Sequence, residues 1–216
     1  MATNNPVRRP LGRPPKSQDQ RQRILREAAK AMATVGYEQC SLASIAKQLD
    51  LTPPALYHYF PTKQSIFSEI AMVTVKGIYE FVSEKINPQL SYGEQLRQMM
   101  LAHAKYFDDN YWMMIATIAG YGGITRREIE HLDEFEAYRS RYEKMLLALL
   151  RGGVRTKEFR DIDVASLARS ILQLLNITRW FRHDGSKSAV DFANESFDLV
   201  YRSLVVQDID IPSNTI

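Results

Sequence analysis

The sequence predicts an all-α protein of about nine helices, with an N-terminal three-helix head containing a helix-turn-helix and a larger C-terminal helical domain. Apolar residues recur every three or four positions through most of the 216-residue chain, which is the spacing of an amphipathic helix. No segment shows the alternation of apolar and polar residues expected of a half-buried strand. Most periodic segments also begin after serine, threonine or aspartate and end at glycine, asparagine or proline, which are helix start and stop signals.

Composition narrows the class of protein. Apolar residues make up 45% of the chain, so it can bury a large core and is not disordered by composition. The one cysteine, Cys40, excludes an internal disulfide and is typical of a reducing compartment; we expect it to pack as a small hydrophobic residue. The N-terminus lacks the apolar segment of a signal peptide, and no apolar run approaches the roughly 18 residues of a membrane span. We therefore expect a cytoplasmic protein with no membrane partner.

Positive charge is concentrated at the N-terminal end. Residues 1–66 contain 10 lysines and arginines against 4 acidic residues, whereas the remainder contains 18 against 21. The formal net charge of +3 therefore conceals a basic N-terminal region and a slightly acidic remainder. A basic region of this kind attracts phosphate, either on nucleic acid or on an anionic membrane surface.

Residues 1–17 form a basic arm without periodicity that contains four of the nine prolines, and we expect it to be disordered. The tripeptide around Arg13, Gly-Arg-Pro, resembles the core of an AT-hook, which lies in a narrow minor groove. A role in DNA binding and a purely solvated tail are both compatible with so short a motif.

Residues 18–67 are predicted to fold as the three-helix head. The first helix spans 18–36 and carries a clear apolar stripe. Two short helices follow in 41–60, for which Ser41 and Thr52 are good N-caps. A helix of this length is not stable alone. Held outward by a scaffold, with polar side chains exposed, the second of them suits insertion into a DNA major groove.

A long helix is predicted from Lys63 to about Ile86, and we place the boundary between the domains inside it rather than in a linker. Residues 68–206 are expected to form an effector-binding and dimerisation domain, and 207–216 a polar tail. Further helices are predicted after Ser91, in the apolar run 111–123, from Thr125 to about Arg155 with fraying at Gly152-Gly153, from Val164 to about Arg182, and after Ser188.

The head carries a recognisable run of residues. An amphipathic helix ending in Gly-Tyr is followed by SLASIAKQLDLTPPALYHYFPTKQSIF, with a serine before the second helix, a small-residue turn, Leu-Tyr-x-x-Phe and then a basic residue. Over about residues 20–67 this run resembles the N-terminal domain of TetR-family transcriptional regulators. The resemblance implies double-stranded operator DNA as a partner.

The resemblance also implies roles for individual residues. Tyr57 and Lys63 match phosphate contacts, and Ser41 matches the hydroxyl that caps the second helix and touches phosphate. The recognition helix has few long polar side chains, so contacts with thymine methyl groups and DNA shape are expected to carry more of the specificity. His58 fits base reading, a phosphate contact or an exposed ring. The predicted DNA-binding residues are Arg13, Ser41, Ser44, Thr52, Pro53, Pro54, Ala55, Tyr57, His58 and Lys63.

In the second domain, aromatic residues, methionines and a histidine gather in 103–121 and 138–142, which is typical of an adaptable ligand pocket. Ordinary core packing is the alternative for each of them. The stretch 178–185 resembles a turn of TetR relatives that sense acyl-CoA, which implies that its arginines meet an anionic ligand group; a salt bridge is the alternative. The predicted effector-binding residues are His103, Phe107, Trp112, Met113, Tyr121, Tyr138, Arg139, Tyr142 and Arg179.

The last two helices have apolar residues on more than one face, so we expect each to be buried on two sides. The resemblance implies that one side forms a four-helix bundle in a homodimer, which would place two recognition helices about one DNA turn apart on a palindromic operator. The predicted interface residues are Leu174, Leu175, Trp180, Phe192, Phe197 and Tyr201.

An enzyme is not expected. The sequence has no glycine-rich phosphate loop, serine elbow or metal-ligand spacing, and its four histidines are scattered. We predict neither a cofactor nor a metal. The expected function is a ligand-responsive repressor whose small-molecule effector is unknown. An activator, and a nucleoid or division regulator without an effector, are the alternatives.

Overall fold

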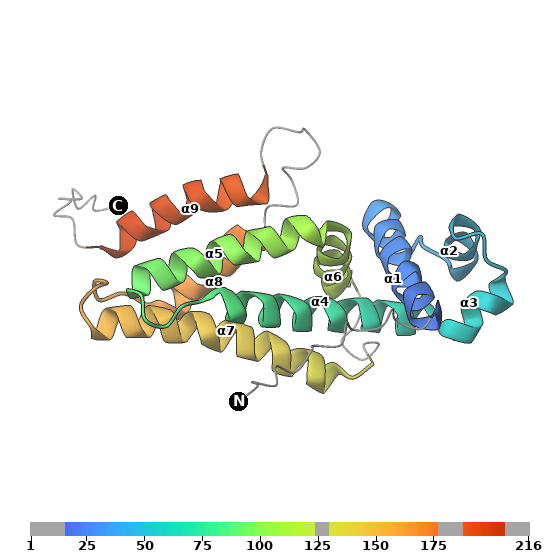
Figure 1. Ribbon diagram of the computed structural model, residues 1–216, viewed down its shortest axis with the longest axis horizontal. Helices are drawn as coiled ribbons and strands as arrows, with labels where there is room; N and C mark the ends of the chain where they lie inside the picture. Colours follow the sequence, from blue (N-terminus) through green and yellow to red (C-terminus); the bar gives the residue numbers. More distant parts are fainter. Residues whose placement is uncertain (1–15, 124–129, 177–187, 206–216) are drawn as a thin grey trace, which may run out of the picture.

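The computed structural model describes residues 16–123, 130–176 and 188–205, and within these ranges the secondary structure is entirely α-helical. The predicted all-α fold class is therefore confirmed. The molecule is elongated, with α1–α3 at one end and the remaining helices forming the body (Figure 1). The nine helices of the described ranges are α1 (Lys16–Val35), α2 (Leu42–Gln48), α3 (Pro53–Tyr59), α4 (Lys63–Lys85), α5 (Tyr92–Asp109), α6 (Tyr111–Gly123), α7 (Leu132–Arg155), α8 (Val164–Asn176) and α9 (Ala189–Leu204).

The head is built around one side chain from each of its helices. Ile24 of α1, Ile45 of α2 and Leu56 of α3 are completely buried, and Cys40 is buried beside them. Seven-residue helices such as α2 and α3 cannot persist alone in water, so this shared core holds them in place.

The turn between α2 and α3 is a Schellman motif. The Leu51 N–H donates to the Ala46 carbonyl (2.9 Å), the Asp50 N–H donates to the Lys47 carbonyl (3.3 Å), and Asp50 has a left-handed φ of 54°. Aspartate tolerates this conformation better than most residues. The motif stops α2 sharply and sets the direction in which α3 leaves.

Helix α4 joins the head to the body (Figure 1). It begins with a capping box in which the Ser65 N–H donates to Thr62 Oγ1 (3.0 Å) and the Thr62 N–H donates to Ser65 Oγ (3.3 Å). The cluster of buried residues around the head core includes Ala116 of α6 and Phe135 of α7. The head is therefore packed on the body instead of being tethered to it.

Two local contacts fix the head end of the body. A Cβ atom placed on Gly120 of α6 would lie 2.3 Å from the ring of Phe67 of α4, so only glycine permits this approach. The buried Ser68 hydroxyl of α4 accepts a hydrogen bond from the Glu130 N–H (2.9 Å), just before α7. Together these contacts tie α4 to both α6 and the start of α7.

In the body, α5 packs against α4, α7 and α9, and α8 packs mainly against α7. Two carboxylates cap its helices across long sequence separations. Glu158 accepts from the N–H groups of Tyr92 (2.8 Å) and Gly93 (2.6 Å) at the start of α5. Asp108 accepts from the Ala189 N–H (3.2 Å) at the start of α9. Each carboxylate satisfies backbone donors that a helix leaves unpaired at its N-terminus.

The predicted fraying at Gly152-Gly153 is wrong. Helix α7 continues through both glycines to Arg155. A Cβ on Gly152 would lie 2.2 Å from the Tyr92 ring, and one on Gly153 would lie 2.1 Å from the Phe159 ring. The glycines are there because two rings pack directly on the helix backbone, which compensates for the conformational entropy that glycine loses in a helix.

The predicted start of α7 at Thr125 is also wrong. The helix begins at Leu132, because His131 before it has a left-handed φ of 57°. Thr125 itself lies outside the described residues. Helix α8 is described as far as Asn176, so the predicted continuation to Arg182 lies outside the described residues as well. None of the described helices is both long enough and apolar enough to cross a membrane.

Candidate functional site

Helix α3 presents its polar and proline-rich side to solvent. Leu56 and Phe60 are buried in the head core and anchor the helix, whereas Pro53, Tyr57 and His58 are exposed. Thr52 and Pro54 are exposed too, and Ala55 is half-buried. Thr52 Oγ1 accepts from the Ala55 N–H (3.4 Å), which is a weak N-cap. The outward side of α3 thus carries a phenol, an imidazole and apolar surface, but no long cationic side chain.

Ser41 and Ser44 form a complete capping box at the start of α2. The Ser44 N–H donates to Ser41 Oγ (3.1 Å), and Ser44 Oγ accepts from the Ser41 N–H (3.2 Å) while donating to the Ser41 carbonyl (2.7 Å). Both residues remain exposed. Ser41 was predicted as the cap, whereas the part of the Ser44 hydroxyl in completing it was missed.

Lys63 makes contacts that were not foreseen from the sequence. Its Nζ donates to the carbonyl oxygens of Tyr37 (2.9 Å) and Glu38 (3.3 Å) and lies 4.3 Å from the centre of the Tyr37 ring. The ammonium group therefore ties the start of α4 to the turn between α1 and α2. Any phosphate contact by Lys63 would compete with, or add to, these bonds.

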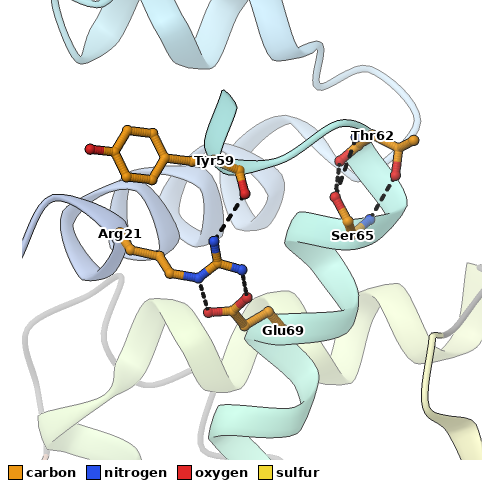
Figure 2. Close-up of polar contacts among 5 residues, drawn as sticks. All are labelled: Arg21, Tyr59, Thr62, Ser65 and Glu69. Atoms are coloured by element: carbon orange, nitrogen blue, oxygen red, sulfur yellow. Dashed lines mark hydrogen bonds and ion pairs between the residues drawn. The ribbon is translucent and has the colours of Figure 1, made fainter. Parts of the chain in front are cut away.

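A second residue missed from sequence, Arg21 of α1, holds the end of the recognition helix (Figure 2). Its guanidinium donates to the Tyr59 carbonyl (2.9 Å), to Glu69 Oε1 of α4 (2.8 Å) and also to Glu69 Oε2, and it stacks 4.2 Å from the centre of the Phe60 ring. The hydrogen bond and charge of Glu69 raise the pKa of Arg21. One planar group thus links α1, the end of α3 and α4.

The body contains a cavity of about 460 Å³, a volume within the range of small-molecule sites. Its wall is formed by α4, α5, α6, α7 and α8. The apolar part of the wall consists of Val75, Ile78, Met114, Ile118, Phe135 and Leu172. The polar part consists of Thr74, His103, Thr117, Arg139, Tyr142, Glu143, Arg169, Gln173 and Asn176.

A buried polar pair lies in this wall. His103 of α5 and Tyr142 of α7 are 3% and 6% exposed, and His103 Nδ1 lies 2.7 Å from Tyr142 Oη. The other ring nitrogen, His103 Nε2, is buried and has no hydrogen-bond partner among the protein atoms. Burial lowers the pKa of His103 to about 4 and raises the pKa of Tyr142, so both side chains are neutral at neutral pH.

The rim of the cavity is charged. Arg139 and Glu143 of α7 and Arg169 of α8 line it and are exposed. Arg139 pairs with Glu136 one turn away (3.2 Å), and Arg169 donates to Ser166 Oγ (3.3 Å). Two guanidinium groups and one carboxylate are therefore the exposed charged groups of the cavity wall.

The structure gathers only some of the predicted effector-binding residues at the cavity. His103, Arg139 and Tyr142 line it, but Phe107, Trp112, Met113 and Tyr138 do not. Phe107 is buried in the core of the body, Trp112 is 36% exposed, and Met113 borders a smaller pocket beside α1. Tyr138 contacts the Tyr79 ring. The side chain of Tyr121 and the residues Arg179 and Arg13 lie outside what the structure describes.

Sequence reasoning missed the contributions of α4 and α8 to the cavity. Val75, Leu172 and Arg169 are spaced like any amphipathic helix residue, so no local signal marked them. Their convergence follows from how α4, α7 and α8 pack, which is a property of the fold.

The predicted dimer-interface residues are divided between two environments. Leu175 and Phe197 are 1% and 7% exposed and belong to the core of their own chain, and the Tyr201 ring stacks on Phe197. Leu175 and Phe197 are therefore covered within one subunit, because they lie on the inner face of their helices, whereas Tyr201 is half-buried. Leu174 and Phe192 are half-buried. Trp180 lies outside the described residues.

An exposed leucine was missing from that prediction. Leu199 of α9 is 72% exposed, the largest exposure of any large hydrophobic residue in the described ranges. It lies two turns after Phe192 on the same helix.

Along the described chain no group of His, Cys, Asp or Glu side chains is arranged to hold a metal ion.

These features define a class of protein: a helix-turn-helix DNA-binding regulator whose head is packed on a domain with a ligand-sized cavity. Residues 24–70 match the family model for bacterial regulatory proteins of the tetR family, and residues 89–204 match that for the tetracyclin repressor-like C-terminal domain. The chain belongs to the TetR family of transcriptional regulators.

Similar proteins share most of the chain length. The crystal structure of the TetR-family regulator PfmR from Thermus thermophilus is 37% identical, covers 83% of this chain and 97% of its own, and superimposes with a TM-score of 0.75. The transcriptional repressor KstR2 of Rhodococcus jostii is 23% identical over 202 residues, which is 90% of this chain and 93% of KstR2. The regulator FadR of Bacillus subtilis, solved with stearoyl-CoA, is 20% identical, with a TM-score of 0.68 over 84% of this chain and 98% of its own.

Proposed function

We propose that this protein is a ligand-responsive transcriptional repressor that binds a palindromic operator as a homodimer and is released by an acyl-CoA-like or other small hydrophobic effector. The observation that carries the proposal is the cavity, whose wall combines apolar side chains with polar ones and includes the exposed guanidinium groups of Arg139 and Arg169. An apolar tail suits the interior, and an anionic head group suits the rim.

The position of the cavity supports a link between effector and DNA. Val75 of α4 and Phe135 of α7 line the cavity and also belong to the buried cluster that contains the head core. A ligand that displaces either side chain therefore acts on packing shared with α1–α3. Release follows if the ligand binds more tightly to the arrangement in which the two heads are misplaced for DNA.

The relatives support the same class of effector. FadR of Bacillus subtilis was solved with stearoyl-CoA, and its fold resembles that of this chain. In this chain Asn176, the last described residue of α8, lines the cavity and comes shortly before Arg179 in the sequence. A nucleoid or division regulator without an effector would not need a cavity of this size.

Dimerisation is proposed through the outer faces of α8 and α9. One seven-residue recognition helix offers few base contacts, so two copies are needed for useful affinity. The exposed Leu199 and the half-buried Leu174 supply apolar surface for a two-fold contact.

The DNA-binding residues are proposed from the exposed side of the head. Ser41, Tyr57 and His58 offer hydrogen-bonding groups, and Thr52, Pro53, Pro54 and Ala55 offer surface for thymine methyl groups. Arg13 in the arm is proposed to add a minor-groove or phosphate contact. Deleting residues 2–16 should then weaken operator binding and reduce its salt dependence, whereas unchanged affinity and slope would assign the arm no role.

The test is binding of purified protein to the DNA upstream of its own gene, measured by gel shift and fluorescence anisotropy with and without a series of CoA thioesters. We expect specific binding to a palindrome and release by at least one thioester, with free CoA as the control. Failure to bind any palindrome there would refute the repressor. Binding that no thioester or small hydrophobic compound weakens would refute the effector class.

A further inference from the structure

The buried pair His103–Tyr142 restricts which ligand can fill the cavity. Both residues line the wall, together with apolar side chains such as Ile78 and Met114. Tyr142 Oη lies 2.7 Å from Nδ1 of His103, and Nε2 is buried without a hydrogen-bond partner among the protein atoms. One ring nitrogen of the imidazole therefore has no hydrogen-bond partner among the protein atoms, in a part of the wall that also contains apolar side chains.

Hydrocarbon alone is a poor complement to such a wall. A buried polar group left without a partner costs about 1–3 kcal/mol. A plain alkyl chain packed against His103 would leave Nε2 in that condition. Nε2 is itself covered by neighbouring side chains, so a ligand oxygen that displaces them and reaches Nε2 would remove the penalty, and the wall would discriminate between two ligands that differ only by this oxygen.

The oxygen that fits is uncharged. At neutral pH both His103 and Tyr142 are neutral, because burial disfavours their ionised forms. If Tyr142 donates to Nδ1, the Nε2–H donates to a ketone; if Nδ1–H donates to Tyr142, Nε2 accepts from a hydroxyl. A carboxylate would require a cation, and the guanidinium groups of Arg139 and Arg169 lie at the exposed rim instead.

We propose that the effector carries a hydroxyl or ketone within its apolar part, bound by Nε2 of His103, in addition to an anionic end at the rim. This inference rests on the proposed function, because it assumes that the cavity is the effector site. It separates an oxygenated acyl thioester from a plain saturated fatty acyl thioester as the ligand class.

The experiment compares ligands that differ by one oxygen. Isothermal titration calorimetry of the full-length protein would measure Kd for decanoyl-CoA and for the positional isomers of hydroxydecanoyl-CoA and oxodecanoyl-CoA. At least one isomer should bind roughly tenfold more tightly than decanoyl-CoA, which is what a satisfied buried group contributes. The ring nitrogen signals of His103 in ¹⁵N NMR should shift with that isomer and not with decanoyl-CoA.

Variants assign the preference to the pair. The double variant His103→Phe/Tyr142→Phe replaces both polar partners with apolar rings, which keeps the wall packed. It should bind decanoyl-CoA at least as tightly as the wild type and lose the preference for the oxygenated isomer. Thr117→Val is the matched control, because the Thr117 hydroxyl in the same wall already donates to the Met113 carbonyl (2.8 Å). This variant should keep the preference.

Two results would overturn the proposal: equal affinity of the wild type for every isomer and decanoyl-CoA, or a preference that survives in the double variant. Equal affinities with retained operator release would leave the proposed function intact while refuting the buried oxygen. Absence of binding by any thioester would refute the effector class itself, and this inference would fall with it.

Discussion

At the scale of single residues, His103 couples the cavity to the stability of the whole chain. Its pKa is about 4 in the folded protein and returns to the ordinary 6.5 on unfolding. Above pH 6.5 the imidazole is neutral in both states and has no effect. As the pH falls from 6.5 towards 4, the unfolded state binds a proton at His103 that the folded state does not bind. The free energy of unfolding therefore decreases.

We therefore predict that part of the stability lost in acid depends on His103 and disappears when His103 is replaced. The free energy of unfolding of the wild type should fall by about 2 kcal/mol more between pH 7.5 and pH 5 than that of His103→Phe/Tyr142→Phe. Urea unfolding at both pH values measures this difference, and comparing the two proteins cancels the contribution of other titrating groups. The same decrease in both proteins would show that His103 does not stay neutral when folded.

Arg21 is the second residue whose chemistry extends beyond its own helix. Replacing it with lysine keeps the charge but cannot bond both Glu69 oxygens and the Tyr59 carbonyl at once. The side chains of Arg21 and Glu69 are 41% and 29% exposed, so we expect a modest loss of about 1 kcal/mol in unfolding free energy. Operator affinity should fall as well, because the end of α3 is released.

The control is Arg23→Lys on the same helix, where the side chain is exposed. It should unfold like the wild type. Urea unfolding and fluorescence anisotropy with operator DNA measure the two effects. If Arg21→Lys matches the Arg23 control in both measurements, the contacts of Arg21 drawn in Figure 2 contribute nothing to the stability or DNA binding of the head.

Residue roles were the part that sequence predicted least well. The caps Ser41 and Thr52 were identified because capping depends on neighbours within one turn. The hydrogen bond from Lys63 to the Tyr37 carbonyl was not predicted, because it joins residues 26 positions apart. The same reason applies to Arg21 and Glu69, which are 48 positions apart.

At the scale of helices, starts were predictable wherever a side chain caps its own helix. Ser91 and Ser188 cap α5 and α9 as the sequence indicated. The start of α7 was not predictable, because it depends on the backbone conformation of His131. Helical glycines were also misread, because the ring that fills the space above each one comes from elsewhere in the chain.

Replacing Gly120 tests whether a ring packed on a helical glycine contributes to stability. Alanine there would place its Cβ 2.3 Å from the Phe67 ring, in a contact that both α4 and α6 need. We expect Gly120→Ala to lower the unfolding free energy by about 1–3 kcal/mol through overpacking, although alanine is the better helix former. Adding Phe67→Leu should recover part of the loss, and thermal unfolding of the two single variants and the double variant measures the coupling.

The neighbouring Ala119→Ser provides the control, since Ala119 is exposed on the same helix. It should change stability by much less. A Gly120→Ala variant as stable as the wild type would mean that α6 and α4 separate at little cost.

At the scale of the whole molecule, the cavity is the feature that the sequence concealed. Five helices contribute to it, and its members are ordinary core or surface residues in their own helices. His103, Arg139 and Tyr142 were predicted because aromatic residues, methionines and a histidine gather in these segments, and the same composition led to Phe107 and Trp112, which do not line the cavity. Ligand sites assembled from several helices require the packing to be known.

Dimerisation is the last property that depends on the whole molecule. Leu199→Asp would place a carboxylate at the apolar centre of the proposed interface, and two-fold symmetry would place a second one in the same contact. Losing two buried leucines, each contributing about 1.5–3 kcal/mol, should weaken the dimer by more than roughly 100-fold. Light scattering after size-exclusion chromatography should then report a monomer, and operator affinity should fall because only one recognition helix binds at a time. Leu90→Asp, which changes another exposed leucine in the loop between α4 and α5, should remain dimeric. A dimeric Leu199→Asp protein with full operator affinity would place the two-fold contact on another face of the body, and the outward side of α9 would then need a different partner.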